Sequence, residues 1–255
     1  GRVRLEVRSL TSSAPRSFKS ISFDVREGEI LGIGGLVGAQ RTELVEAIFG
    51  LRSVQSGSVL IDGKDVRIRA PYDAISHGLG LITEDRRESG IFPLLSVTMN
   101  TAVASLSKFQ NHFGLLDFKR LSGETKKINV LLRTKTPSME TPVQNLSGGN
   151  QQKVIVSRWL MTLPDILIMD EPTRGIDVGA KYEIYLIMKE LVKQGKSIIM
   201  VSSEMPELIG MSHRIIVLCN GYLTGILEKK TATQESIMAL ATQFNAKASV
   251  NGSCN

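Results

Sequence analysis

The stretch LSGGNQQKVIVSRWLMTLPDILIMDEPTRGID, residues 146–177, decides the fold of this chain. Residues 146–153 read as a glycine turn, and the apolar pattern that follows predicts a helix over residues 154–163. Pro164 and Asp165 then stop this helix. The first half of the stretch is therefore a glycine turn that opens onto a helix.

The second half begins with four apolar residues, Ile166 to Met169. A short apolar run of this kind is typical of a strand that is buried on both faces of a parallel sheet. The strand ends in Asp170 and Glu171. Burying two carboxylates at the end of a strand costs folding free energy, so we expect both to have a functional role. A bound magnesium ion and a water molecule that attacks phosphate would explain why two acids stand there.

Each of these signals has an ordinary explanation when it is taken singly. A Ser-Gly-Gly sequence is usually a loop, and Asp-Glu after a strand is usually a solvated turn. Their order and spacing, followed by Gly175-Ile176-Asp177, argue for more. The stretch resembles the signature motif, the Walker B motif and the D-loop of the ABC transporter family, in that order.

The composition indicates a globular protein without unusual features. The chain has 255 residues, of which 42% are hydrophobic and 22% charged, so it can bury a sizeable core as one large domain or two small ones. No apolar run approaches the length of a membrane span, and the basic amino terminus lacks a signal-type segment. Cys219 and Cys254 suggest neither a disulfide framework nor a metal site. We therefore expect a soluble, cytosolic domain.

The net charge of +6 would allow nucleic acid, anionic lipid or nucleotide phosphate as a partner. The basic residues are spread along the chain, however, and the cluster over residues 85–88 contains two acids and two arginines. A solvated surface explains this charge better than a polyanion-binding face does. We expect no nucleic-acid partner.

A second glycine loop lies near the amino terminus. Residues 30–34 predict a buried strand, and residues 35–42, GLVGAQRT, lead into a helix that ends at Gly50. A strand, a glycine loop and a helix in this order form the setting of a phosphate-binding loop, in which backbone N–H groups and the helix N-terminus face the anion. A glycine turn without a ligand remains the alternative on this motif alone.

The loop departs from the Walker A pattern Gly-x-x-x-x-Gly-Lys-Ser/Thr at two positions. Gly35 and Thr42 fit, but Gln40 stands at the second glycine and Arg41 at the lysine. Gln40 adds a side chain where the backbone curls round phosphate, and Arg41 is longer and planar. We therefore expect weak or altered phosphate binding.

The remaining elements complete an α/β core. Alternating patterns predict strands at residues 3–7 and 21–25, and Asp62-Gly63 and Asn220-Gly221 predict hairpin turns. Other strands are expected at residues 80–83, 197–201 and 215–218, and other helices at residues 70–77, 180–194, 206–211 and 233–241. Residues 96–133 read as helices with loops. We predict one domain over residues 1–245, with a core of residues 1–89 and 144–245, a helical subdomain of residues 90–143 and a disordered tail of residues 246–255.

Residues 3–241 as a whole resemble a nucleotide-binding domain of the ABC transporter family. They are most similar to the carboxyl-terminal half of the ATP-binding subunit of bacterial monosaccharide importers of the galactose/methylgalactoside, ribose and xylose type. The segments that carry this narrower resemblance are residues 35–39, 84–87, 146–153, 170–181 and 202–208. The implied fold is an α/β P-loop NTPase of ABC type: a RecA-like mixed or parallel sheet core, an antiparallel β subdomain and a helical insertion.

The resemblance also implies roles for individual residues, with ATP and Mg²⁺ as cofactors. Thr42, Asp170 and Glu84 would hold or sense the magnesium, and Glu171 would polarise the attacking water. The residues that bind the nucleotide phosphates would be those of the phosphate loop and of the first turn of the helix after it: Gly35, Leu36, Val37, Gly38, Ala39, Gln40, Arg41, Thr42 and Glu43. The signature would contact a nucleotide on a facing domain through Leu146, Ser147, Gly148, Gly149, Asn150 and Gln151, with Asp177 as the D-loop acid.

Two further positions depart from the family pattern. Ser203 stands where the switch histidine is expected, and a hydroxyl cannot carry the charge of an imidazole. His213 lies ten residues beyond it, and we expect it to pack or face solvent. No aromatic residue for adenine is evident near the amino terminus, where Phe18 is expected to belong to a strand.

These features together predict the ATP-binding domain of a carbohydrate importer. Its signature would complete the ATP site of a partner half, and its own site would bind nucleotide weakly and turn over slowly. The expected partners are the amino-terminal half of the same subunit, an integral membrane permease and, indirectly, a periplasmic or extracellular sugar-binding protein. The expected location is the cytoplasmic face of the inner membrane. The alternative is a non-hydrolytic module that uses the ABC fold only for regulation or assembly.

Overall fold

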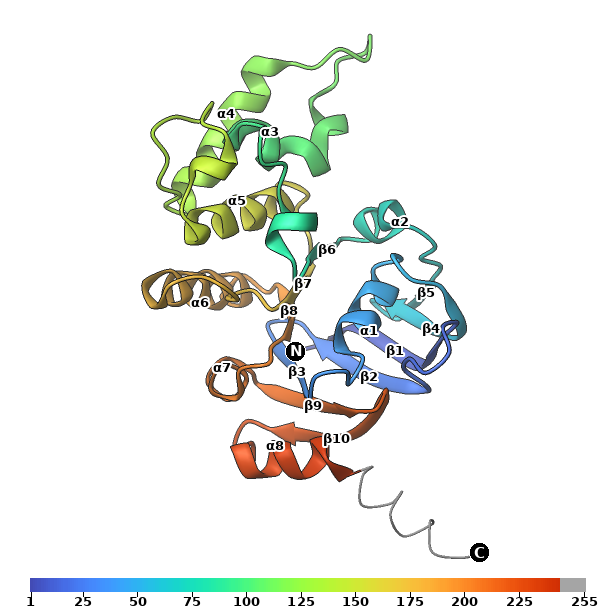
Figure 1. Ribbon diagram of the computed structural model, residues 1–255. Helices are drawn as coiled ribbons and strands as arrows, with labels where there is room; N and C mark the ends of the chain where they lie inside the picture. The colour runs from blue at the N-terminus through green and yellow to red at the C-terminus, as the bar shows by residue number, and fades with distance from the viewer. Residues whose placement is uncertain (244–255) are drawn as a thin grey trace, which may run out of the picture.

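The computed structural model describes residues 1–243 and contains two sheets joined by helices (Figure 1). The predicted disordered tail, residues 246–255, lies outside the described residues. The antiparallel sheet has the order β2-β1-β4-β5. Its strands are β1 (Val3–Ser12), β2 (Ile21–Arg26), β4 (Val54–Ile61) and β5 (Lys64–Val66).

The second sheet has six strands in the order β10-β9-β3-β8-β7-β6, and all are parallel except β10. These strands are β3 (Ile30–Gly35), β6 (Leu79–Ile82), β7 (Ile166–Asp170), β8 (Ser197–Val201), β9 (Arg214–Cys219) and β10 (Tyr222–Glu228). The α/β class, the mixed sheet and both predicted hairpins are thus confirmed.

The helices are distributed between the sheets and one end of the molecule. Those associated with the two sheets are α1 (Arg41–Ile48), α2 (Pro71–Ser76), α6 (Val178–Lys193), α7 (Met205–Met211) and α8 (Gln234–Ala241). At the end of the molecule lie α3 (Val97–Ala102) and α4 (Phe118–Leu131), and α5 (Gly148–Met161) packs both against these two helices and against the six-stranded sheet. The short turns are η1 (Arg86–Gly90), η2 (Val103–Phe109) and η3 (Val143–Asn145). In Figure 1, α3, α4 and α5 gather beyond β6, away from the antiparallel sheet.

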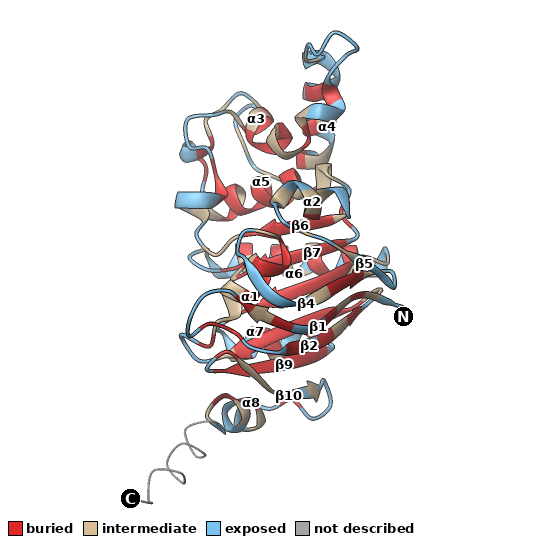
Figure 2. Ribbon diagram, turned by 90° about the vertical axis from the view of Figure 1, so that its right-hand side faces the viewer, coloured by how far each residue is buried: buried red, intermediate tan, exposed pale blue. Residues whose placement is uncertain are grey.

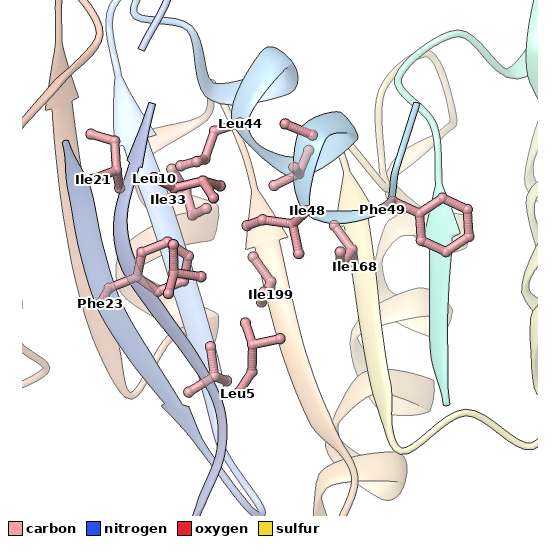
Figure 3. Close-up of a cluster of buried hydrophobic side chains, with 14 of the residues drawn as sticks. Leu5, Leu10, Ile21, Phe23, Ile33, Leu44, Ile48, Phe49, Ile168 and Ile199 are labelled. Carbon is pink, nitrogen blue, oxygen red and sulfur yellow. The ribbon is translucent and has the colours of Figure 1, made fainter. Parts of the chain in front are cut away.

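The described residues hold two large hydrophobic clusters, one on each face of the six-stranded sheet, and a small third one of Ala102, Phe109 and Leu121 among the helices. Because side chains alternate along a strand, Ile168 and Ile199 point to one face while Leu167 and Met200 point to the other. The first face packs against α1 and the antiparallel sheet, as Figure 3 shows for Leu5 and its neighbours. The second face is covered by α5, α6, α7 and α8. Figure 2 shows β6, β7 and β9 buried, whereas much of β4 is exposed.

Two local predictions were wrong. The helix expected to start at residue 154 begins at Gly148, so the glycines form its first turn. Phe18 lies in the loop between β1 and β2 rather than in a strand, and it is fully buried. Phe18 therefore cannot stack on a ligand in this structure.

Parallel strands bring their carboxyl ends to one edge of the sheet, where ligands commonly bind in open α/β sheets. The loops that follow β3, β6, β7 and β8 meet at this edge, and they hold most of the residues singled out in the sequence. Within residues 1–243, no helix is both long enough and apolar enough to span a bilayer.

Candidate functional site

The loop between β3 and α1, residues 35–42, is open to solvent, and Val37 at its tip is 97% exposed. Gly35 and Gly38 have φ angles of 153° and 81°. A side chain at Gly35 would come within 2.5 Å of the Leu218 carbonyl oxygen, so only glycine fits there. The buried Ala39 packs into the core and offers the loop only its backbone. The loop therefore curls as a phosphate-binding loop does, with the N-terminus of α1 behind it.

Gln40 and Arg41, the two departures from the phosphate-loop pattern, take specific positions. Gln40 has a φ of 71°, in the left-handed region that glycine occupies without strain, and its amide nitrogen donates to the Gly38 carbonyl at 3.2 Å. The Nη1 of Arg41 donates to the Ser202 carbonyl oxygen at 2.9 Å. The Gln40 side chain thus lies along the loop, while the charge of Arg41 is directed to the end of β8.

Thr42, Asp170 and Glu84 come together beside this loop from three different elements. The Thr42 Oγ1 donates to Glu84 Oε2 at 3.5 Å, and Thr42 lies close enough to Asp170 to lower the pKa of that carboxyl. Asp170 is 1% exposed, and its Oδ1 has no hydrogen-bond partner. Burial, with a smaller effect of the nearby carboxylates, raises the pKa of Asp170 to about 7.

These oxygen atoms fit Mg²⁺, which prefers hard ligands and is usually held by one or two carboxylates together with phosphate oxygens and water. The buried Asp170 oxygen without a partner is the atom that a cation would satisfy. Within residues 1–243, no group of three or more His, Cys, Asp or Glu side chains is arranged to hold an ion alone.

Glu171 and Ser203 face each other across the ends of β7 and β8. The Ser203 hydroxyl donates to Glu171 Oε2 at 3.1 Å, and Glu171 itself has a left-handed φ of 48°. Burial raises the pKa of Glu171, and the hydrogen bond from Ser203 opposes that shift. A carboxylate with a raised pKa can accept a proton from water. Ser203 can orient this carboxylate, although it lacks the charge of an imidazole.

A buried network that the sequence did not reveal braces these loops. Glu207, on α7, accepts hydrogen bonds from Thr173 at 2.8 Å and from the hydroxyl of Ser202. Thr173 follows β7 and Ser202 follows β8, so one carboxylate joins the segments that carry Glu171 and Ser203. The only sequence signal was that Glu207 belongs to the segment of residues 202–208 that carried the family resemblance.

The N-terminus of α5 holds the residues predicted to form the signature. Ser147 is the N-cap, but its side chain does not bond the helix backbone and instead accepts from Asn150 Nδ2 at 2.8 Å. The first N–H groups of α5 thus lack a side-chain cap, as an anion-binding helix start requires. Gln151 and Leu146 are buried, and Gln151 Nε2 donates to the Leu146 carbonyl at 3.2 Å. This buried hydrogen bond stabilises the turn that leads into α5.

Each signature glycine has a separate spatial reason. A side chain at Gly149 would place its Cβ 2.4 Å from the Cβ of Ala180 on α6. A side chain at Gly148 would lie 3.1 Å from the Nη2 of Arg86. Gly149 therefore allows α5 and α6 to approach, and Gly148 leaves space that the Arg86 guanidinium borders.

The remaining candidates have simpler surroundings. Asp177 caps α6 by accepting from the backbone N–H of Ala180 at 2.9 Å. Glu43 lies in the first turn of α1. His213 accepts a hydrogen bond at Nδ1 from the N–H of Ile30, at 3.0 Å. Because Ile30 begins β3 and the phosphate loop follows the end of that strand, His213 lies at the opposite edge, where it is exposed to solvent.

Arg174 lies in the candidate site, and no pattern in the sequence predicted it there. It forms an ion pair with Glu84, ninety residues away, and so links the loop after β7 to the loop after β6. No short-range pattern could have revealed this pair.

Comparisons with known proteins agree with this geometry. The family model described as ABC transporter matches residues 18–174. The chain is 58% identical over 244 residues to the galactose/methyl galactoside import ATP-binding protein MglA of Clostridium tetani (strain Massachusetts / E88), covering 96% of this chain and 48% of that protein. It is 50% identical over 242 residues to the protein of the same name from Escherichia coli (strain K12), covering 95% and 48%. The chain spans about half the length of these relatives.

Solved structures resemble the whole fold. The MJ1267 ATP-binding cassette of an ABC transporter matches with a TM-score of 0.80 at 18% identity, covering 94% of this chain and 99% of that one. The MJ0796 cassette, in a dimeric post-hydrolysis state bound to ADP and Pi, matches with a TM-score of 0.75 at 20% identity, covering 88% and 98%. The cassette fold is thus established independently of the close relatives, and together with the family match it shows that the chain belongs to the ABC transporter family.

Proposed function

We propose that this chain is a nucleotide-binding domain of a carbohydrate importer, in which it couples the binding and hydrolysis of ATP to sugar uptake. The relatives at 58% and 50% identity are both named as galactose/methyl galactoside import ATP-binding proteins. These names support galactose or a methyl galactoside as the cargo. The location that follows is the cytoplasmic face of the cell membrane, against an integral membrane permease that receives sugar from a binding protein.

The chain has two candidate anion-binding elements, the N-terminus of α5 and the loop of residues 35–42, and their structures differ. We base the roles of the two halves of the proposed subunit on this difference. The N-terminus of α5 has no side-chain cap and begins with two glycines. In the phosphate loop, by contrast, Gln40 takes a strained conformation and Arg41 bonds the Ser202 carbonyl. We infer that α5 completes the ATP site of a facing half, while the loop of residues 35–42 binds its own nucleotide weakly. This contrast is the observation that carries the proposal.

The chain retains the groups for hydrolysis in its own site. The Ser203 hydroxyl holds the Glu171 carboxylate, whose raised pKa suits it to take a proton from water. Mg²⁺, held by Asp170 and Thr42, would supply charge neutralisation to the phosphates. Because the weakness lies in binding rather than in the base, we expect slow turnover rather than none.

Nucleotide binding and ATPase activity of the purified domain test the proposal. We expect weak ATP binding by calorimetry, and we expect the double variant Gln40→Gly with Arg41→Lys to bind at least tenfold more tightly. Tight binding and fast turnover by the unmodified domain alone would contradict the division of labour. Absence of nucleotide binding in both the domain and the double variant would instead favour the non-hydrolytic assembly module.

The role of α5 is tested in a subunit that carries both halves. Replacement of Gly148 by alanine should abolish transport, because the new methyl group borders the anion site. Gly123→Ala is the matched control, since Gly123 also lies in a helix and a Cβ there meets nothing within 4 Å. Equal transport by the two variants would rule out the role assigned to α5.

The proposed permease contact lies over residues 84–100. Leu94 is 78% exposed, and Phe92 and Leu95 beside it are also exposed. Exposed apolar side chains grouped in this way mark an interaction site. Cysteines at Leu94 and at Leu163, which is 73% exposed and lies after α5, can be compared in crosslinking to the permease. Crosslinks formed only through position 163 would relocate the contact.

A further inference from the structure

Arg86 lies between the signature helix and the loop that precedes α6. Its Nη2 donates to the Gly175 carbonyl oxygen at 3.5 Å. The same atom is 3.1 Å from the point that a Cβ on Gly148 would occupy, and Cζ is 3.4 Å from it. Arg86 begins η1, the short turn after β6, and is half-buried. The guanidinium is therefore held beside the first residue of α5.

This position adds a full positive charge to an element that already attracts anions. A helix N-terminus carries roughly half a positive charge through its N–H groups, and α5 presents these groups without a side-chain cap. The guanidinium also offers several N–H donors in a planar fork, the geometry that pairs best with phosphate oxygens. The absence of a side chain at Gly148 lets an anion approach the helix start and Arg86 together.

We propose that Arg86 is a binding residue for the terminal phosphate of a nucleoside triphosphate held by the facing domain. It acts from the same side as the α5 N-terminus and stabilises the closed pair of domains. This inference rests on the proposed function, because only a facing domain brings a nucleotide to α5. The side chains of residues 146–151 are neutral, and Arg86 would therefore add the positive charge at this phosphate site.

The experiment measures closure of the two halves rather than turnover. In the two-half subunit, a cysteine pair across the domain seam reports closure by crosslinking as Mg²⁺ and ATP are titrated. Arg86→Gln should raise the ATP concentration needed for half-maximal closure by about tenfold or more, since it removes a charge-assisted hydrogen bond to phosphate. Arg86→Lys should restore part of the loss because it keeps the charge. Arg8→Gln, which removes an exposed arginine on β1, is the control and should behave as the unmodified subunit.

Thermal unfolding of each variant without nucleotide separates binding from structure. If Arg86→Gln and Arg86→Lys impair closure equally and both lower the unfolding temperature, Arg86 only braces the loop at Gly175 and the inference fails. If Arg86→Gln closes normally while Gly148→Ala does not, the inference fails and the proposed role of α5 survives. If both variants close normally, the proposed role of α5 fails with it. A shift in the ATP requirement with unchanged stability and partial rescue by lysine supports the inference.

Discussion

Arg174 and Glu84 form an ion pair beside Thr42, in the candidate metal site. The pair uses Oε1 of Glu84, while Oε2 accepts from the Thr42 hydroxyl at 3.5 Å. The Glu84 carboxylate thus binds the Arg174 guanidinium through one oxygen and the Thr42 hydroxyl through the other. A metal ion that takes Glu84 as a ligand must displace the Arg174 guanidinium or lie close to it, and two cations at one carboxylate repel each other.

Replacement of Arg174 by glutamine should therefore strengthen binding of the metal with nucleotide. The Arg174 side chain is largely exposed and that of Glu84 partly exposed, and ion pairs open to solvent contribute at most about 1 kcal/mol, so the gain should not exceed roughly fivefold. Titration with Mn²⁺ in the presence of ADP, followed by electron paramagnetic resonance, measures the affinity directly. Arg52→Gln is the control, because it breaks an exposed ion pair with Glu46 at the far end of α1. Weaker Mn²⁺ binding by Arg174→Gln would mean that the arginine organises the site instead of competing for it.

Much of the fold could be predicted from the sequence because its signals are local. The buried strands are short apolar runs, the hairpins carry Asp62-Gly63 and Asn220-Gly221, and the spacing of glycines marks the loop after β3. Each of these signals depends on residues within a few positions of one another. The structure therefore confirms these elements with shifts of a few residues at their ends.

The errors and omissions concern contacts between distant parts of the chain. Helix propensity disfavours the Gly148-Gly149 start of α5, but packing of Gly149 against Ala180, thirty-one residues away, makes glycine necessary there. Arg174 reaches Glu84, and Arg41 reaches the Ser202 carbonyl, across still longer separations. Periodicity and spacing carry no information on such pairs, and only the tertiary arrangement reveals them.

The Gly149–Ala180 contact predicts a compensating pair of substitutions. Gly149→Ala should lower the free energy of unfolding by about 1–3 kcal/mol, because its Cβ would lie 2.4 Å from the Cβ of Ala180. Adding Ala180→Gly removes that clash and should recover most of the loss. Urea denaturation of the two single variants and the double variant gives the coupling energy. Additive effects, with no recovery in the double variant, would show that the glycine is needed for another reason.

The Ser203–Glu171 hydrogen bond predicts a shift in the pH dependence of hydrolysis. This bond lowers the pKa of Glu171 against the effect of burial, so Ser203→Ala should let the pKa rise further. A general base acts only when it is ionised, and the acidic limb of the rate profile should therefore move to higher pH. Single-turnover hydrolysis at saturating ATP, measured across pH, tests this expectation. Ser122→Ala, at an exposed position on α4, should leave the profile unchanged. An acidic limb that moved to lower pH would exclude Glu171 as the base.

Asp170 predicts how the stability of the nucleotide-free domain depends on pH. Its pKa is about 7 in the folded domain, because burial disfavours the charged form, against an ordinary value of 3.8 in the unfolded chain. Between these values the folded state holds a proton that the unfolded state has lost. Stability therefore falls as pH rises from about 4 to about 7, and it remains at the lower level above that range.

Asp170→Asn removes this loss, since an amide does not ionise. The variant should match the unmodified domain near pH 4 and exceed its free energy of unfolding by on the order of 2–4 kcal/mol at pH 8, given 1.36 kcal/mol for each pKa unit. Urea denaturation at several pH values without nucleotide or magnesium measures the difference. Asp165→Asn serves as the control, because Asp165 is exposed and paired with Lys196. A stabilisation by Asp170→Asn that was equal at pH 4 and pH 8 would show that Asp170 stays in one protonation state, and the site would then hold no carboxylate poised to exchange its proton for a metal ion.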